Sequence, residues 1–269
     1  MRDRPTTQTY GTIVVIGGGC YGSYYVRQLG RARDAGALAW ERLVVVDRDA
    51  QCRVASEGPT GVQLEISDWA AFLTRFLRER PGPGHAIVPS PLMPHLLFDW
   101  TAERLSAAGR LVRTLEPTAV DGVPWQRAGD ERTRYLSFAE WMCPVNCIEP
   151  ARCPHTRDAR TWSMPVALRA HVDASSTGSV ARSAAGSAAG SAGGSVPLDL
   201  SLTFHCTHRA FGVGMIDVAA VLAAEARLLE ESARRPVRAV VGTVSHCHGA
   251  FGVLEVRAAG TDWSAGRRN

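Results

Sequence analysis

The sequence TIVVIGGGCYG, residues 12–22, runs from a continuous apolar segment directly into a cluster of glycines. The apolar segment, residues 12–16, has no polar alternation, which predicts a strand that is buried on both faces. Residues 23–29 then place apolar side chains at helical spacing. The pattern therefore predicts a strand, a tight glycine turn and a helix in direct succession.

Three of these glycines are spaced as G-x-G-x-x-G, and each has its own physical role. Gly17 lets the chain turn tightly, Gly19 lets the backbone approach a pyrophosphate, and Gly22 lets the helix pack closely on the sheet. A phosphate here would meet free N–H groups and the positive end of the helix dipole. This is the dinucleotide-binding fingerprint. We expect the cofactor to be held by Gly17, Gly18, Gly19, Cys20, Tyr21 and Gly22.

A second buried strand, residues 42–47, ends in Asp47, where such folds place a carboxylate that bonds a ribose hydroxyl. With this acid, residues 11–120 resemble the Rossmann NAD(P)-binding superfamily, in a short form similar to potassium-channel regulatory domains and siroheme synthase N-terminal domains. The resemblance implies NAD or NADP. Asp47 favours NAD because it repels a 2′-phosphate, whereas Arg48 and Arg53 could accommodate NADP. Residues 48–53 contain no glycine, whereas flavoproteins of this fold usually have a glycine pair shortly after the acid. This difference argues against FAD as the cofactor.

Alternating strand and helix patterns continue through the first part of the chain and return near its end. We expect strands at residues 61–65, 85–89, 110–115, 198–204, 237–244 and 251–256, and helices at 67–80, 94–108 and 213–234. The predicted fold is α/β, a parallel Rossmann-like sheet with a Cys-rich irregular segment and a C-terminal β-α-β unit. The expected divisions are a dinucleotide-binding domain (1–120), a Cys-rich metal-binding segment (121–173), a Ser/Ala/Gly linker (174–196) and the β-α-β unit (197–269).

The composition of the 269 residues excludes several classes of protein. The net charge of +4 is mild and the arginines are scattered, so nucleic acid is not an expected partner. The sequence has no lysine, which excludes Schiff-base, pyridoxal phosphate and Walker A chemistry, because each needs one. No apolar run approaches the ~20 residues of a membrane span. Seven cysteines without a secretion signal indicate the cytoplasm, with metal or redox use rather than disulfides.

Residues 143–155 read CPVNCIEPARCPH, a C-x3-C-x5-C-P-H pattern in a loop that prolines stiffen. Thiolates this close can converge on one metal centre, and sulfur ligands select zinc, copper(I) or iron–sulfur. The final Cys-Pro is similar to the end of bacterial ferredoxin motifs, although the spacing differs. We expect an iron–sulfur cluster, with a Cys3His zinc site and three buried, unliganded cysteines as the alternatives. The candidate ligands in this loop are Cys143, Cys147, Cys153 and His155.

Histidines and cysteines also follow two predicted strands, as HCTH at residues 205–208 and HCH at 246–248. The following residues repeat, because HRAFGV at 208–213 matches HGAFGV at 248–253. If the intervening helix makes a β-α-β unit, the two strands are parallel and both turns lie at their carboxyl edge. We therefore expect His205, His208, His246 and His248 to bind a metal or move protons. Cys206 or Cys247 could supply a fourth ligand to the loop at 143–155.

Three hypotheses of function follow from these patterns. The leading one is a cytoplasmic NAD(P)-dependent oxidoreductase or electron-transfer protein that couples a dinucleotide to a Cys-bound metal centre, with a redox protein as possible partner. The second is a non-catalytic dinucleotide-sensing or assembly subunit with structural zinc. The third is a metal-dependent hydrolase or metal-handling protein that uses only the histidine edge. The sequence indicates no substrate and no oligomeric state.

Overall fold

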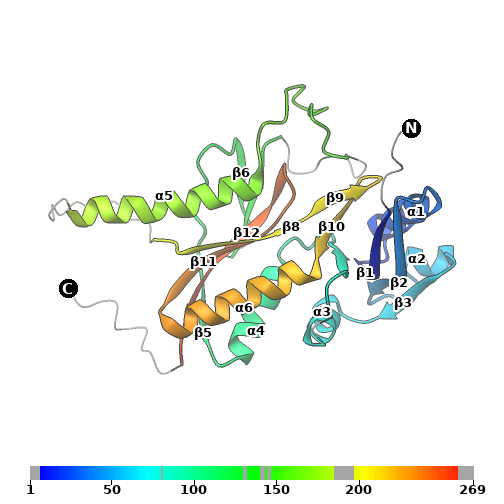
Figure 1. Cartoon of the computed structure of the whole chain (residues 1–269), viewed down its shortest axis with the longest axis horizontal. Helices are drawn as coiled ribbons and strands as arrows, with labels where there is room; N and C mark the ends of the chain where they lie inside the picture. Colours follow the sequence, from blue (N-terminus) through cyan, green and yellow to red (C-terminus); the bar gives the residue numbers. More distant parts are fainter. Residues whose placement is uncertain are drawn as a thin grey trace.

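The computed structural model describes residues 7–79, 81–129, 132–139, 143, 147–184 and 197–259. This part of the chain is a mixed α/β structure in which helices cover two β-sheets (Figure 1). The helices within it are α1 (Cys20–Asp34), α2 (Arg53–Glu57), α3 (Trp69–Arg78), α4 (Leu96–Ala107), α5 (Met164–Ala184) and α6 (Val218–Arg234).

The first sheet has the strand order β3-β2-β1-β4-β10-β9. Its strands are β1 (Gln8–Ile16), β2 (Leu38–Asp47), β3 (Val62–Ile66), β4 (Ala86–Val88), β9 (Thr207–Ala210) and β10 (Val213–Asp217). β3, β2, β1 and β4 are mutually parallel, and the hairpin β9–β10 adds to β4 in antiparallel orientation. The glycine turn after β1 therefore lies at the edge where the parallel strands have their carboxyl ends.

The second sheet has the order β6-β7-β12-β11-β8, and β5 also pairs with β12. Its strands are β5 (Leu111–Leu115), β6 (Trp125–Ala128), β7 (Arg134–Ser137), β8 (Leu200–His205), β11 (Val237–Val244) and β12 (His248–Arg257). β8 and β11 are parallel, with Val244 opposite His205, whereas the other pairs are antiparallel. The predicted parallel arrangement of the two strands that precede the histidine turns is confirmed.

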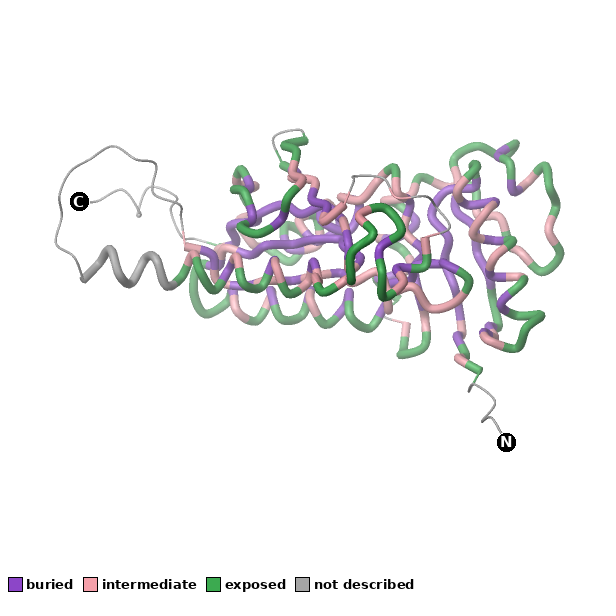
Figure 2. Tube along the Cα trace, turned by 90° about the horizontal axis from the view of Figure 1, so that it is seen from above, coloured by how far each residue is buried: buried purple, intermediate pink, exposed green. Residues whose placement is uncertain are grey.

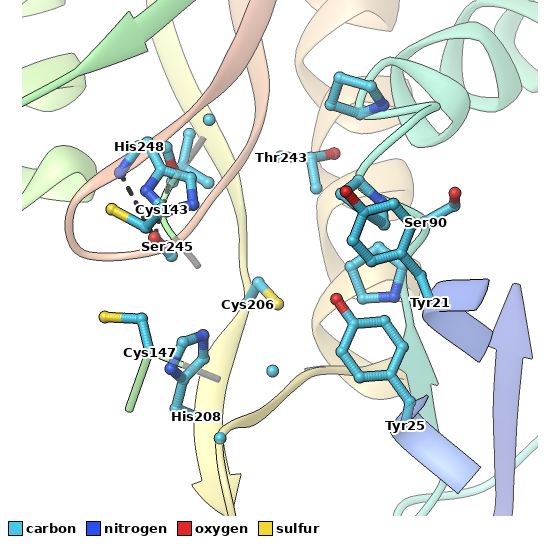
Figure 3. A pocket seen from close by; sticks show the side chains of 17 residues that line it. Tyr21, Tyr25, Ser90, Cys143, Cys147, Cys206, His208, Thr243, Ser245 and His248 are labelled. Atoms are coloured by element: carbon cyan, nitrogen blue, oxygen red, sulfur yellow. Dashed lines mark hydrogen bonds between the residues drawn. The ribbon is translucent and has the colours of Figure 1, made fainter. Parts of the chain in front are cut away.

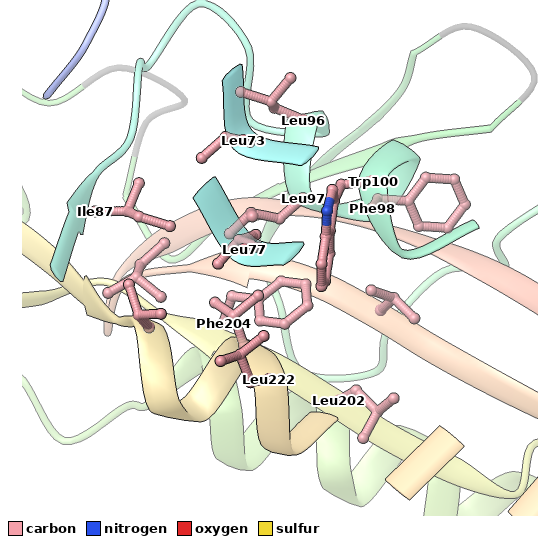
Figure 4. Close-up of a cluster of buried hydrophobic side chains, with 14 of the residues drawn as sticks. Leu73, Leu77, Ile87, Leu96, Leu97, Phe98, Trp100, Leu202, Phe204 and Leu222 are labelled. Atoms are coloured by element: carbon pink, nitrogen blue, oxygen red, sulfur yellow. The ribbon is translucent and has the colours of Figure 1, made fainter. Parts of the chain in front are cut away.

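Apolar side chains on the two faces of the second sheet enter different cores. Val240 and Val244 pack with Leu168 of α5, whereas Ala239 and Val241 point to the opposite face, which α4 and α6 cover (Figure 1). That second core also contains residues of α3 and of the first sheet, and Phe204 of β8 meets side chains of α3 and α4 there (Figure 4). The most deeply buried segments are the central strands of both sheets (Figure 2). One continuous core thus joins the two sheets.

Two strands differ from the predictions: β5 pairs with another strand than expected, and β10 forms where a helix was expected. The strand predicted at 110–115 exists as β5, but it pairs with β12 in the second sheet instead of extending the parallel sheet. The position beside β4 is occupied by β10. The sequence at 213–217, predicted as the start of a helix, forms β10, so α6 begins only at Val218. The backbone is left-handed at Phe211 (φ 50°) and Gly212 (φ 78°), which makes a tight turn and folds the segment back as a hairpin.

The sequence repeat at 208–213 and 248–253 is not a structural repeat. The first copy forms the β9–β10 hairpin of the first sheet, and the second lies entirely within β12 of the second sheet. The C-terminal unit divides between the two sheets, since its hairpin β9–β10 extends the first sheet whereas β8, β11 and β12 belong to the second. Similar short sequences adopt different structures here because their neighbours provide different strands to pair with.

α5 extends to Ala184, well into the Ser/Ala/Gly segment that we predicted as a linker from residue 174. Alanine has the highest helix propensity, so an alanine-rich segment can continue a helix that already packs on the sheet. The rest of the predicted linker, residues 185–196, lies outside the described residues. α3 begins as predicted, because the Asp68 side chain accepts hydrogen bonds from the backbone of Ala70 and Ala71.

Candidate functional site

Of the three glycines at the fingerprint positions of the turn between β1 and α1, two are required by the local geometry and one is not. Gly17 has φ 90°, a conformation that other residues rarely adopt. A Cβ atom on Gly22 would collide with the carbonyl oxygen of Gly17. Gly19, in contrast, has φ −74°, and a Cβ atom there would meet nothing within 4 Å. The space beside Gly19 is therefore open to a bound group.

Asp47, at the end of β2, lies beside this turn. Its Oδ2 accepts a hydrogen bond from the backbone N–H of Gly18 at 2.6 Å, and its Oδ1 accepts one from Asp49 at 2.9 Å. Val54 of α2 donates its backbone N–H to the carbonyl of Gly18 at 2.9 Å. Arg48 is exposed next to the acid. These bonds hold the predicted ribose-binding carboxylate against the predicted phosphate-binding turn.

The short helix α2, which the sequence analysis did not predict, brings a carboxylate to the first turns of α1. Glu57 accepts hydrogen bonds from the Ser23 hydroxyl at 2.6 Å and from Arg53 Nε at 2.7 Å. The hydroxyl, followed by the guanidinium, lowers the pKa of Glu57 to about 2. The exposed thiol of Cys20, at the start of α1, lies 3.8 Å from Arg53 Nη1. The carboxylate of Glu57 therefore places a negative charge near the N-terminus of α1, where the helix dipole stabilises negative charge.

A cavity of about 150 Å³, here called the first cavity, separates the start of α1 from the second sheet (Figure 3). Tyr21 and Tyr25 of α1 point into it, and across it lie Cys206 and His208 (Figure 3). Its other polar side chains are Ser90, Cys143, Cys147, Thr243, Ser245 and His248. Residues directly after the glycine turn and residues of both histidine turns therefore line one space.

Most of the cysteines line a neighbouring cavity of about 200 Å³, here called the cysteine cavity. Its lining includes Cys143, Cys147, Cys153 and Cys247, together with Glu149, Pro150, Pro154, His155 and Arg160. Cys143 and Cys147 line both cavities. The predicted Cys loop therefore lies between the first cavity and the cysteine cavity, and two of its cysteines line the first cavity together with Tyr21.

The rings of His205 and His246 lie edge to face with their centroids 4.6 Å apart, as expected for turns at one edge of parallel strands. Three buried imidazole nitrogens, His205 Nε2, His208 Nδ1 and His246 Nδ1, have no hydrogen-bond partner among the described residues. Burial lowers the pKa of His205, His208 and His248. Neutral imidazole is the form that ligates metals or accepts a proton.

Glu149 is a member of this group that the sequence analysis missed. Its side chain is buried (7% exposed), and its Oε1 accepts a hydrogen bond from the backbone N–H of Cys247 at 3.2 Å. Burial raises the pKa of Glu149, but the hydrogen bond with Ser245 and the charges of His208 and His248 outweigh it and bring the pKa below its ordinary value. The sequence feature that could have identified Glu149 is its position as a carboxylate within a Cys- and Pro-rich loop.

The thiols differ in their surroundings. Burial raises the pKa of Cys206 and of Cys247 to about 12. Burial also raises the pKa of Cys153, but hydrogen bonds from the backbone of Thr156 and His155 outweigh it, so this pKa is lowered. Trp162 Nε1 donates a hydrogen bond to Cys247 Sγ at 3.4 Å. Within the described ranges no three His, Cys, Asp or Glu side chains are close enough to share a single metal ion.

The second half of the chain matches a known family. A family model described as "Uncharacterized protein, C-terminal domain" (AF_1314_C) matches residues 97–257. The chain belongs to this family. The AF_1314_C match runs from α4 to the end of β12, so it includes the Cys loop and both histidine turns but not the glycine turn. No curated protein and no solved structure matches the chain. Among the described helices, none has the length and apolar character needed to cross a membrane.

Proposed function

We propose that this protein is an NAD(P)-linked redox protein, an oxidoreductase or electron-transfer protein, that couples a dinucleotide to a Cys-bound iron–sulfur centre. The observation that carries the proposal is the position of Cys143 and Cys147. They line the first cavity, which Tyr21 of the glycine turn also lines, and they line the cysteine cavity. A dinucleotide at the turn and a metal centre among the thiols would be neighbours.

The dinucleotide half of the proposal rests on the first sheet. The strand order β3-β2-β1-β4 changes direction between β1 and β4, and open α/β sheets bind ligands at such a switch point. This strand order supports the Rossmann-like arrangement that the sequence resemblance implies. The open space at Gly19 and the adjacent Asp47 carboxylate fit a pyrophosphate and a ribose.

The metal half rests on the cysteine cavity. A water molecule needs roughly 10–15 Å³ of such space, so about 200 Å³ is far more than a single ion requires. The volume of the cavity and the cysteines in its lining support a polynuclear cluster, for which Cys143, Cys147 and Cys153 would be ligands. Such a group supplies one-electron transfer. The chain itself supplies the thiolates, and the prolines of the loop limit the entropy lost when they converge.

The first cavity would hold the reacting end of the dinucleotide. Burial raises the pKa of Tyr25, so its hydroxyl stays protonated and can donate a hydrogen bond. His208, with a buried nitrogen that has no partner among the described residues, can accept a proton in the same cavity. Tyr25 would thus orient the nicotinamide ring, and His208 would accept the proton that remains when the hydride of NAD(P)H gives up its two electrons, one at a time, to the metal centre.

Metal analysis of protein purified without oxygen tests the proposal, with iron, zinc and acid-labile sulfide measured together. We expect a brown protein that contains iron and sulfide and is bleached by NADH or NADPH. With ferricyanide as probe, one NAD(P)H should reduce two ferricyanide ions and release one proton. A colourless protein without iron would contradict the metal half. Stoichiometric zinc with nucleotide binding but no turnover would assign the non-catalytic sensing or assembly function instead.

A further inference from the structure

The cysteine cavity contains one thiol that comes from outside the Cys loop. Cys143, Cys147 and Cys153 belong to the loop, whereas Cys247 lies in the turn between β11 and β12. We propose that Cys247 completes a four-thiolate ligand set with these three and that the set holds a [4Fe–4S] cluster. The inference deepens the proposed function, on which its iron–sulfur part rests, by identifying the fourth ligand.

The turn that carries Cys247 is firmly attached to the loop it would complete. Cys247 is 5% exposed, and its backbone N–H donates to Glu149 Oε1 at 3.2 Å. Its carbonyl accepts a hydrogen bond from Phe138 at 2.9 Å, and Met164 donates to the carbonyl of His246 at 2.9 Å. These three hydrogen bonds attach the turn to Glu149 of the Cys loop, to Phe138 after β7 and to Met164 at the start of α5. The thiol is therefore presented to the cavity by a rigid element, as a ligand position requires.

The other candidates for the fourth ligand are less well placed. Cys206 lines the first cavity, where its sulfur packs against Gly214, 2.5 Å from where a Cβ atom of that glycine would be. His155 lines the cysteine cavity, but it belongs to its exposed rim. Cys247 is the buried thiol that the second sheet adds to this cavity.

Trp162 and Arg160 are placed to stabilise thiolate ligands in this cavity, whereas the carboxylate of Glu149 in the same lining opposes them. Trp162 donates an N–H to Cys247 Sγ at 3.4 Å and is itself fixed by stacking on Phe138, with ring centroids 5.7 Å apart. Arg160 lines the same cavity and supplies positive charge. Hydrogen bonds to the sulfur ligands orient them and tune the potential of an iron–sulfur centre.

Cys247→Ser and its matched control Cys206→Ser test the inference, each purified anaerobically beside the wild type. We expect about four iron atoms and four sulfides per wild-type chain and per Cys206→Ser chain. Cys247→Ser should lose at least half of its iron or convert to a three-iron form with its own electron paramagnetic resonance signal. A Cys247→Ser protein with the wild-type iron content and spectrum would overturn the inference, as would equal loss of iron in Cys206→Ser.

Trp162→Phe provides a second readout that does not depend on the folding of Cys247→Ser. Loss of the N–H donor should lower the reduction potential while the iron content stays unchanged, and an unchanged potential would contradict the placement of Cys247.

Wild-type protein with a cluster that NAD(P)H does not reduce would contradict the proposed function but not the ligand set. Wild-type protein that contains zinc in place of iron and sulfide would overturn the inference. Wild-type protein with neither metal would overturn the inference.

Discussion

At the scale of single residues, Gly19 and Gly22 occupy the same turn for different reasons. Gly22 is required by packing, since a Cβ atom would collide with the carbonyl of Gly17. Gly19 has neither a positive φ nor a close neighbour, so nothing in the surrounding protein demands a glycine there. Its function, on the proposal above, is to leave room for a pyrophosphate.

Gly19→Ala should therefore fold as the wild type does but bind NADH and NADPH at least about tenfold more weakly, because a methyl group that must be accommodated costs roughly 1–3 kcal/mol. Calorimetric titration of both dinucleotides measures the change. Gly30→Ala is the matched control: it lies in α1, its Cβ atom would meet nothing within 4 Å, and binding should be unaffected. Unaltered binding by Gly19→Ala would contradict a phosphate at this turn.

Gly22→Ala should fail to fold or lose several kcal/mol of stability.

At the scale of strands, Glu255 holds the centre of the second sheet together. It is 1% exposed on β12, and it accepts hydrogen bonds from Arg113 of β5, from Arg238 of β11 at 3.2 Å and from Arg257 at 2.9 Å. Burial raises the pKa of Glu255, but the hydrogen bonds of Arg257 and Arg113 outweigh it, so the pKa is lowered. The buried carboxylate therefore favours the folded state when it is ionised.

Glu255→Ala should lower the free energy of unfolding by about 1–3 kcal/mol, because it leaves the largely buried guanidinium of Arg257 (11% exposed) without this partner. Urea denaturation measures the loss, and Glu230→Ala is the control, since its ion pair with Arg234 is exposed and worth below about 1 kcal/mol. The stability from ionised Glu255 is present above the unfolded pKa of about 4.3 and is lost as the pH falls through the lower folded pKa. The difference from wild type should shrink below about pH 4; a constant difference would contradict the ion cluster.

At the scale of the whole molecule, the shared core makes the two sheets one cooperative unit. Phe204 of β8 is 1% exposed and packs in the same cluster as Val14 of β1 and Leu73 of α3 (Figure 4). A core that includes residues from both sheets ties their unfolding together. The first cavity lies between them, so its walls depend on this core.

Phe204→Ala should cost about 3–5 kcal/mol and should shift the unfolding of both sheets equally. Hydrogen exchange of peptides from β1 and from β11, followed across a urea series, should give one common midpoint in wild type and variant. Two separate midpoints would show that the sheets unfold independently. Leu92→Ala is the control, because Leu92 is 63% exposed and its truncation should change stability by about 0.5 kcal/mol or less.

Several elements of the fold could be predicted because their signals are local. The buried run before Gly17, the cap at Asp68 and the strand 237–244 are properties of neighbouring residues, and the structure contains them. The partners of β5 and β10 could not be predicted. The pattern at 110–115 indicates a strand and that at 213–217 indicates a helix, but which edge a strand joins depends on apolar surface supplied by residues a hundred or more positions away. The same holds for Glu149, whose burial depends on the turn at 245–247.

The amino-acid sequence by itself determined the strand–glycine turn–helix unit, the acid at the end of β2, and the position of both histidine turns at one edge of parallel strands. Backbone sterics, side-chain periodicity and the handedness of crossovers act over short stretches, so they can be read from order alone. Only the tertiary structure decided that Cys206 and Cys247, alike in sequence context, line different cavities. The reason is physical: each strand pairs where it can bury its apolar face, and that choice places the thiol that follows it.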